Sequence, residues 1–300
     1  MRVRLVAVLL LAGLGACTCQ GRRPVGRDAG VAPAATTPTH GPSENRLTPA
    51  ARVGTVYGRV LLEPGTILPR WSLDEIGRGA DASPIPPECG PPRDVDTLPV
   101  TGVGSPTRLV GVMVSATGPR DPFFAALGAW EPADRVATIE HCRVAPKMIS
   151  ATIGDTLVIE NDTDVAFLPT AGPALFHETL IRGQSRRVPL DRGGVSSVQC
   201  GFAAACGRGE LIVIFHPVHT VTDADGRFEL RNVPADMDIE LHAFHLYFEE
   251  AGRTVRVSRN GRVELDITIR PKVIARTQTD AERAAAARDA GAARPVPPGN

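Results

Sequence analysis

The sequence predicts an all-β protein built as an antiparallel β-sandwich. Three observations support this fold class: apolar residues fall in short runs, turn-forming residues separate the runs, and few stretches have the period of a helix. Aromatic residues make up only 4% of the chain, so the core must consist mainly of Val, Ile, Leu and Ala. Short strands at close spacing are typical of two sheets packed face to face.

Nine runs rich in β-branched and aliphatic residues are the expected strands. They cover residues 55–62, 108–115, 147–153, 156–160, 210–215, 226–230, 239–244, 254–257 and 263–269. Turn residues lie between them, and Asp223 and Asp225 before Gly226 are interpreted as turn formers. Asn260-Gly261, between the last two runs, predicts a two-residue type I′ hairpin, because Asn and Gly tolerate positive φ.

The N-terminus has the parts of an export signal. Two arginines precede an apolar stretch from Leu5 to Leu14, and about ten residues are too few to span a bilayer. The following Leu14-Gly15-Ala16-Cys17 resembles the lipobox of bacterial lipoproteins. That resemblance implies that residues 1–16 are a signal peptide, cut off just before Cys17, whose thiol carries lipid. The alternatives are an ordinary signal peptide cut elsewhere and a short membrane anchor.

Lipid attachment would hold the protein at a membrane, and several acyl chains do so far more firmly than one. Thr18 stands where many Gram-negative lipoproteins carry the residue that is read in sorting. It is not the aspartate associated with retention in the inner membrane. The resemblance therefore implies an outer-membrane lipoprotein that faces the periplasm.

The charge balance argues against a nucleic-acid partner. The chain has 33 basic and 33 acidic side chains, and loss of residues 1–16 would remove two arginines and no acid, which leaves a net charge of −2. Nucleic-acid-binding domains are usually basic. The expected partners are the membrane, through the lipid anchor, and a protein of the cell envelope.

Four cysteines lie in the body of the chain: Cys89, Cys142, Cys200 and Cys206. In an oxidising compartment they can form two disulfides, with three possible connectivities. The short loop between the last two favours Cys200–Cys206, which leaves Cys89 to pair with Cys142.

Part of the sequence resembles the carboxypeptidase regulatory-like (transthyretin-like) domain. The resemblance lies in Val221 to Leu230, with its Thr-Asp-x-x-Gly-x-Phe pattern, and in the Asn232-Val233-Pro234 and Ile239-Glu240-Leu241 that follow. The opening segment from Gly54 to Val60 resembles the first strand of that domain. The resemblance implies a β-sandwich that is typically a non-catalytic packing or binding module.

The region between these stretches resembles a cupredoxin (plastocyanin-like) sandwich. The similarity lies in residues 137–146 and in Gly154 to Asp162. Two later runs, Val195 to Cys200 and Gly209 to His216, resemble the strands on either side of the main copper-ligand loop. Type 1 copper is held by a thiolate, two imidazoles and usually a weak axial thioether.

Only one of these four copper ligands is present. The first histidine would fall at about Phe167 or Leu168, while Cys200 matches the ligand cysteine. Ala203 and Cys206 stand where the second histidine and the methionine would be. No cofactor is therefore expected, and copper stays the alternative.

Two histidine pairs are further candidates for metal binding, His216 with His219 and His242 with His245. Imidazoles bind zinc and copper readily, and a composite site of His216, His219 and either Cys200 or Cys206 is one hypothesis. Residues three apart in a strand point to opposite faces, however. The other interpretation is that these histidines satisfy local hydrogen bonds near one end of a sandwich.

These patterns divide the chain into a signal peptide (1–16), a lipidated N-terminus and disordered linker (17–52), first strands and a Pro/Gly-rich excursion (53–115), a cupredoxin-like region (116–217), a regulatory-like region (218–270) and a disordered or weakly helical tail (271–300).

The common hydrolase, phosphate-loop and zinc-protease motifs are absent, so no enzyme is expected. The expected function is that of a non-enzymatic, membrane-anchored binding or structural module in the cell envelope. The alternative is a periplasmic metal-binding or electron-transfer protein with an unorthodox Cys/His site.

Overall fold

The computed structural model describes residues 45–48, 51–68, 86–89, 100–171, 178–201 and 206–272. The chain divides into residues 1–39 and residues 40–300, and all the described residues belong to the second unit. The expected signal peptide, the lipidation residue Cys17 and nearly all of the expected tail lie outside the described residues.

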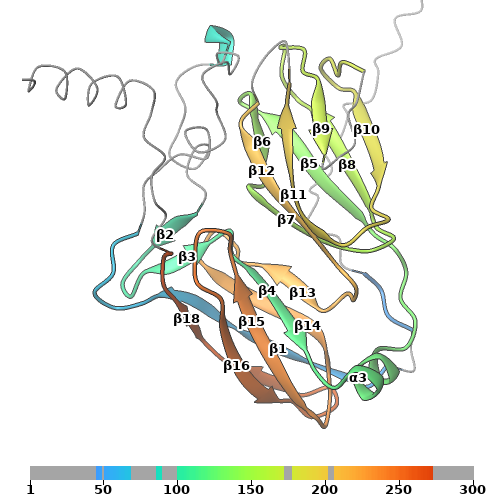
Figure 1. Ribbon diagram of the computed structural model, residues 1–300, viewed down its shortest axis with the longest axis vertical. Helices are drawn as coiled ribbons and strands as arrows, with labels where there is room; N and C mark the ends of the chain where they lie inside the picture. Colours follow the sequence, from blue (N-terminus) through green and yellow to red (C-terminus); the bar gives the residue numbers. More distant parts are fainter. Residues whose placement is uncertain are drawn as a thin grey trace, which may run out of the picture. The chain divides into compact units, whose positions relative to one another are not determined.

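The described chain forms an all-β fold of four sheets arranged as two sandwiches (Figure 1). Its one α-helix among the described residues is α3 (Arg120–Leu127). The predicted all-β class is thus confirmed. No helix in the described segments has the length and apolar character needed to cross a membrane.

The first sandwich, here called the β1 sandwich, is built around a long strand with strict period-two burial. In β1 every second residue is buried, which is the pattern of a strand with one face on a core. Its first sheet contains β1 (Val53–Leu62), β2 (Thr101–Val103), β3 (Arg108–Val110), β14 (Arg227–Pro234), β17 (Arg262–Glu264) and β18 (Ile267–Ile269). Its second sheet contains β4 (Met113–Thr117), β13 (His219–Val221), β15 (Asp238–Phe244) and β16 (Ala251–Arg256).

The second sandwich, here called the β12 sandwich, packs two four-stranded sheets around a separate core. One sheet contains β5 (Asp134–Glu140), β6 (Arg143–Ala145), β8 (Thr156–Asn161) and β10 (Ser185–Pro189). The other contains β7 (Met148–Thr152), β9 (Pro169–Ala171), β11 (Gly194–Cys200) and β12 (Arg208–Ile214). The sheets are mixed and not purely antiparallel, because β5 pairs with β8, and β7 with β12, in parallel.

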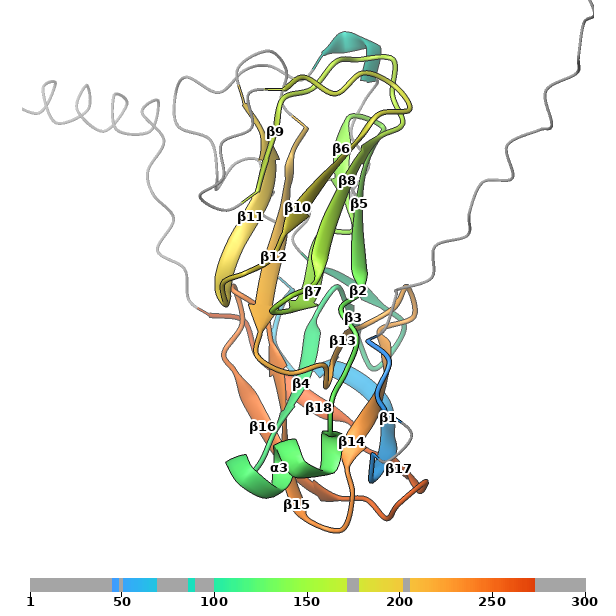
Figure 2. The ribbon, with the colours of Figure 1, turned by 90° about the vertical axis from the view of Figure 1, so that its right-hand side faces the viewer.

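The β12 sandwich is inserted into the β1 sandwich, between α3 and β13 (Figures 1 and 2). Strand β1 hydrogen-bonds to β14, β17 and β18, all from the C-terminal part of the chain. The segments expected at 53–115 and 218–270 therefore form one sandwich. The boundary expected at residue 116 is corrected as well, since β4 and α3 contribute to the core of the β1 sandwich.

The predicted Asn260-Gly261 hairpin is wrong. Strand β16 pairs with β15, whereas β17 lies in the other sheet and pairs with β1. Asn260 has φ 59°, and its N–H donates to the Val53 carbonyl at 2.8 Å. The Thr55 N–H donates to the Gly261 carbonyl at 2.9 Å. The turn thus hydrogen-bonds to β1, and strand β17 after it pairs with β1 in parallel instead of with β16.

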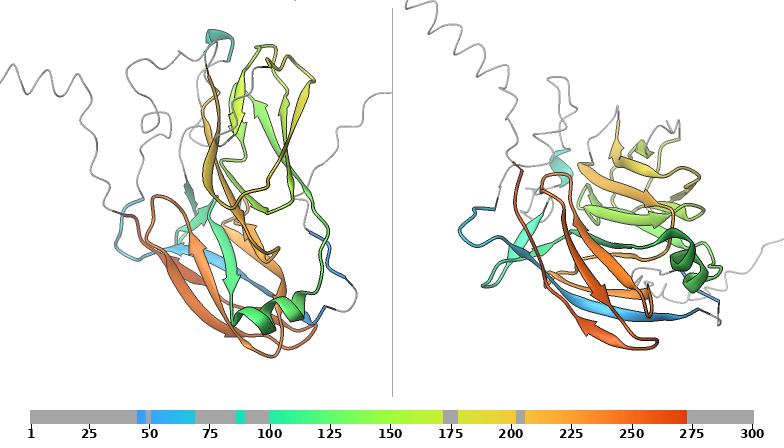
Figure 3. Two further views of the ribbon diagram at one scale, coloured as in Figure 1. Left: turned by 45° about the vertical axis from the view of Figure 1, so that its right-hand side comes forward. Right: turned by 60° about the horizontal axis from the view of Figure 1, so that its bottom comes forward.

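The two sandwiches meet through an apolar cluster on the outer faces of two sheets. Met113 of β4 packs with Met148 of β7 and Ile212 of β12. Ile214, Val221 and Phe244 border this cluster. Figure 3 shows the two groups of strands from further sides. Polar contacts continue beyond the cluster, because the His219 ring lies within hydrogen-bond distance of Thr152 on β7, and the Thr152 hydroxyl also donates to the His216 carbonyl.

Candidate functional site

The end of the β12 sandwich where β11 leads to β12 is closed by disulfides. Cys200 and Cys206 are bonded to each other, with their Cα atoms 5.3 Å apart. Cys89, in the 3₁₀ turn η1 (Pro87–Cys89), is bonded to Cys142 between β5 and β6. All four cysteines pack on the same core. The two predicted disulfides are present with the predicted pairing.

The residues at this end do not fit type 1 copper. Phe167, near the position of a first histidine ligand, is 0% exposed and exchanges two backbone hydrogen bonds with Leu180. The Cys200 sulfur is bonded to Cys206 and so provides no thiolate. Ala203 lies outside the described residues. The described segments contain no group of three or more His, Cys, Asp or Glu side chains placed to hold a metal ion.

The composite site of His216, His219 and Cys200 is not assembled. Both histidines follow the C-terminal end of β12, whereas the disulfide precedes its N-terminal end. Strand β12 has seven residues, which corresponds to about 23 Å at 3.3 Å per residue. The hypothesis fails because an extended strand separates residues that are close in sequence.

His219 instead lies in a buried network between the two sandwiches, here called the polar junction and made up of Asn45, Arg135, Ser150, Thr152, Asp155 and His219. His219 begins β13, and its Nδ1 lies 2.9 Å from Ser150 Oγ on β7. Its Nε2 lies 2.9 Å from Thr152 Oγ1 on the same strand. A hydroxyl group both donates and accepts, so a neutral imidazole is satisfied at both nitrogens.

The carboxylate of Asp155 gathers the donors of the polar junction. It accepts hydrogen bonds from Asn45 Nδ2 at 2.7 Å and from Arg135 Nε at 2.8 Å. The backbone N–H groups of Ala133 and Thr152 also donate to it, each at 2.8 Å. Burial by itself raises the pKa of Asp155, but these hydrogen bonds and the Arg135 charge outweigh burial and lower the pKa below its usual value.

Both histidines near the junction are held neutral. Burial lowers the pKa of His219 to about 3, and the nearby charge of Arg135 acts in the same direction. Burial likewise lowers the pKa of His216 to about 4. The N–H of Val218 donates to His216 Nδ1 at 3.3 Å. Charging the His219 ring would place a second cation near the Arg135 guanidinium, whereas for His216 burial alone disfavours the charged ring.

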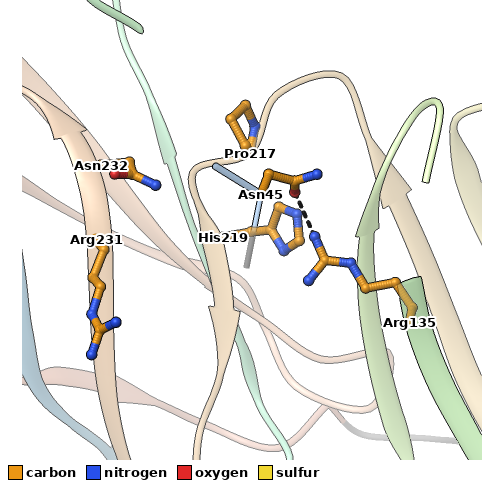
Figure 4. A pocket seen from close by; sticks show the side chains of 6 residues that line it. All are labelled: Asn45, Arg135, Pro217, His219, Arg231 and Asn232. Carbon is orange, nitrogen blue, oxygen red and sulfur yellow. Dashed lines mark hydrogen bonds between the residues drawn. The ribbon is translucent and has the colours of Figure 1, made fainter. Parts of the chain in front are cut away.

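A small pocket opens beside the polar junction, lined by Asn45, Arg135, Pro217, His219, Arg231 and Asn232. Figure 4 shows the side chains of Asn45, His219 and Arg135 grouped together, and the Arg135 guanidinium donates to the Asn45 amide oxygen. The cavity volume is ≈10 Å³, about what one water molecule requires. An organic substrate does not fit here, and the polar groups of the junction bind one another.

Sequence reasoning did not find the polar junction. Asn45 was assigned to the disordered linker at 17–52, but it is 4% exposed, and the next described residues include Leu47, which bridges to Trp130. Asp155 was considered only as part of the segment from Gly154 to Asp162 that resembles a cupredoxin. The available signal was a carboxylate between two closely spaced apolar runs, at 147–153 and 156–160, since a buried carboxylate there needs several donors.

No protein-family model matches the chain, and no curated protein sequence matches it. Solved structures with a similar part include the copper-containing nitrite reductase (NirK) from Thermus scotoductus SA-01, at 22% identity and a TM-score of 0.26, over 33% of this chain and 28% of that chain. Amicyanin from Paracoccus versutus is 18% identical with a TM-score of 0.24, over 33% of this chain and 96% of that one. A purple cupredoxin from Nitrosopumilus maritimus is 17% identical with a TM-score of 0.24, over 27% of this chain and 98% of that one. The match spans less than a third of the reductase.

Proposed function

We propose that this chain is a membrane-anchored, non-enzymatic β-sandwich module of the cell envelope, in which a cupredoxin-like sandwich is inserted into a regulatory-like one. Lipid on Cys17 would anchor it, and the body would bind a protein partner in the periplasm. The observation that carries this proposal is the disulfide Cys200–Cys206, which stands where a copper site would need a free thiolate.

The two disulfides support export, because such bonds persist in oxidising compartments. The polar junction supports a structural role for the buried charges. Arg135 and Asp155 are paired, with side chains 10% and 0% exposed, and neither points into a cavity that would admit a substrate. Such groups hold two sandwiches together in a defined way but offer no open position for chemistry.

The anchoring part of the proposal is tested by labelling the full-length chain with an alkyne analogue of palmitate during growth of a bacterial host. The wild type should be labelled and should sediment with membranes. Cys17→Ser should lose the label, while the matched variant Cys19→Ser should keep it. An unlabelled wild type, or label that persists in Cys17→Ser, would overturn the anchor.

A further inference from the structure

We propose that residues 45–48, here called the clasp, lock the β12 sandwich against the β1 sandwich, and that release of the clasp lets the two sandwiches move apart. In sequence, the clasp stands between Cys17 and strand β1. A pull on the tether, or a partner that binds it, would therefore act on the clasp before it acts on either sandwich. This link to the anchor rests on the proposed function, whereas the clasp itself concerns the folded body alone.

The clasp pairs with the segment before β5 in the manner of a short antiparallel strand. Leu47 forms an antiparallel bridge with Trp130. Backbone hydrogen bonds lie on both sides of this bridge, from Glu131 N–H to the Arg46 carbonyl at 2.9 Å and from Thr48 N–H to the Ala129 carbonyl at 3.0 Å. In an extended segment alternate side chains share one face. Asn45 and Leu47 accordingly point inward, while Arg46 and Thr48 are exposed.

Asn45 binds the β12 sandwich through every polar atom of its amide. Its Nδ2 donates to Asp155 Oδ1 at 2.7 Å and to the Glu131 carbonyl at 2.9 Å. Its Oδ1 accepts from Thr152 Oγ1 at 3.0 Å and from the Arg135 guanidinium, the bond drawn in Figure 4. The side chain is 4% exposed. Only a primary amide supplies two donor hydrogens and an acceptor oxygen at this place.

Leu47 holds the other sandwich. Its side chain packs against the core of the β1 sandwich, together with Trp130 and Phe124 of α3. Two residues that are adjacent on one face of the clasp therefore grip two different sandwiches. This arrangement carries the proposal, because a segment that only ended the tether would need to bind one sandwich.

The clasp is also connected to the contact between the sandwiches by hydrogen bonds. The Thr152 hydroxyl donates to Asn45 Oδ1 at 3.0 Å, so its oxygen can accept from His219 Nε2 at 2.9 Å. Thr152 lies on β7 of one sandwich and His219 on β13 of the other. Loss of Asn45 frees the Thr152 hydroxyl to turn, which weakens the orientation of this contact.

The clasp can open without unfolding the body. It has four residues, and none of them belongs to a strand of the four sheets. When it leaves, Asp155 keeps its hydrogen bonds from Arg135 and from the Ala133 and Thr152 N–H groups. Segments with few buried contacts open at a small fraction of the free energy of global unfolding.

Trypsin digestion of the full-length, oxidised chain tests the release. Arg46 lies within the clasp, and the preceding trypsin site is Arg27, so a cut after Arg46 gives a distinct fragment. Asn45→Ala and Leu47→Ala should each raise the rate of this cut about tenfold, after division by the rate for a synthetic peptide of residues 40–52 with the same substitution. Thr48→Ala is the matched control, since Thr48 is exposed and takes part through its backbone N–H.

Methionine oxidation tests the movement of the sandwiches. Met113 and Met148 are 3% and 2% exposed in the apolar cluster between them. Hydrogen peroxide transfers one oxygen atom to a thioether sulfur, which becomes the sulfoxide, and leaves water. Mass spectrometry should find both methionines oxidised about threefold faster in Asn45→Ala and Leu47→Ala than in the wild type and Thr48→Ala, relative to the half-buried Met237.

Circular dichroism and the urea midpoint of each variant show that it is folded. Equal rates of the cut after Arg46 in the wild type, Asn45→Ala and Leu47→Ala would overturn the clasp. A faster cut with unchanged oxidation of Met113 and Met148 would overturn the coupling, because the segment would then open without moving the sandwiches. Neither measurement involves lipid, so failure of the anchor at Cys17 would show only in the palmitate labelling.

Discussion

Thr152 Oγ1, on β7, lies 2.9 Å from Nε2 of His219, on β13, and so joins one sheet of the β12 sandwich to one sheet of the β1 sandwich. The contact is buried and lies beside the Asp155–Arg135 pair. Because the imidazole is held neutral there, the contact between the sandwiches should respond to pH.

Stability should fall as the pH falls from 7 to 5. The pKa of His219 is lowered to about 3 and that of His216 to about 4, from an ordinary 6.5. The unfolded chain therefore binds protons that the folded chain excludes, and this favours unfolding below pH 6.5. Together, His216 and His219 should lower the free energy of unfolding at pH 5 by about 4 kcal/mol.

Urea unfolding of the wild type and of His219→Gln at pH 7 and pH 5 measures this effect. The variant should lose only about half as much stability as the wild type between the two pH values, because one of the two groups is gone. Asp155 does not confuse the comparison, since its pKa lies below 3.8 and its contribution is lost only in stronger acid. Equal losses in both proteins would contradict the assignment.

Asp155→Asn should destabilise the fold strongly. The substitution leaves the Arg135 guanidinium buried beside a neutral amide, and breaking a buried ion pair on one side costs about 3 kcal/mol or more. Asp238→Asn is the matched control, because its pair with Arg256 is exposed on both sides and should contribute less than about 1 kcal/mol. Chemical denaturation of both variants measures the loss in the free energy of unfolding. Similar losses in the two variants would contradict the stabilising role of the buried Asp155–Arg135 pair.

The two disulfides should differ in their contribution. Cys89–Cys142 closes a loop with a sequence separation of 53 residues, whereas Cys200–Cys206 closes one of 6. Loop-closure entropy then gives about 4 kcal/mol for the first and about 2 kcal/mol for the second. Thermal unfolding of the paired Cys→Ala variants should show the larger loss for Cys89 and Cys142. The reverse order would show that native contacts, and not loop length, determine how much each disulfide stabilises the fold.

Gly58→Ala should disrupt the packing of β1 against the C-terminal strands. A Cβ on Gly58 would lie 2.0 Å from the Leu265 carbonyl oxygen, which is backbone and cannot rotate away. Overpacking of this kind costs about 1–3 kcal/mol or more. Gly201→Ala is the control, since a Cβ there meets nothing within 4 Å. Equal midpoints in urea for the two variants would contradict the close approach.

Strand content was predictable because its signals are local. The run at 108–115 was correctly assigned to strand, but as one element. Gly111, with φ 81°, turns the chain there and sends β3 and β4 into opposite sheets. Helix α3 was missed, although Pro119 before it and Gly128 after it, with φ 68°, are typical boundary residues.

The insertion topology and the polar junction were not predictable from one sequence. They depend on contacts between distant residues, such as Asn45 with Asp155 and Arg59 with Asp266, and no local period encodes such contacts. The disulfide pairing was predictable in part, because a separation of 6 residues favours Cys200–Cys206 on chain length alone.

The most direct test of the proposed non-enzymatic, copper-free role is a Cu²⁺ titration of the full-length chain, followed by visible absorption before and after reduction. With the disulfide intact, no thiolate-to-copper charge-transfer band should appear, and Cys200 and Cys206 should react with a thiol reagent only after reduction. A strong band in the oxidised protein that disappears in Cys200→Ser would contradict this account and establish a copper–thiolate centre.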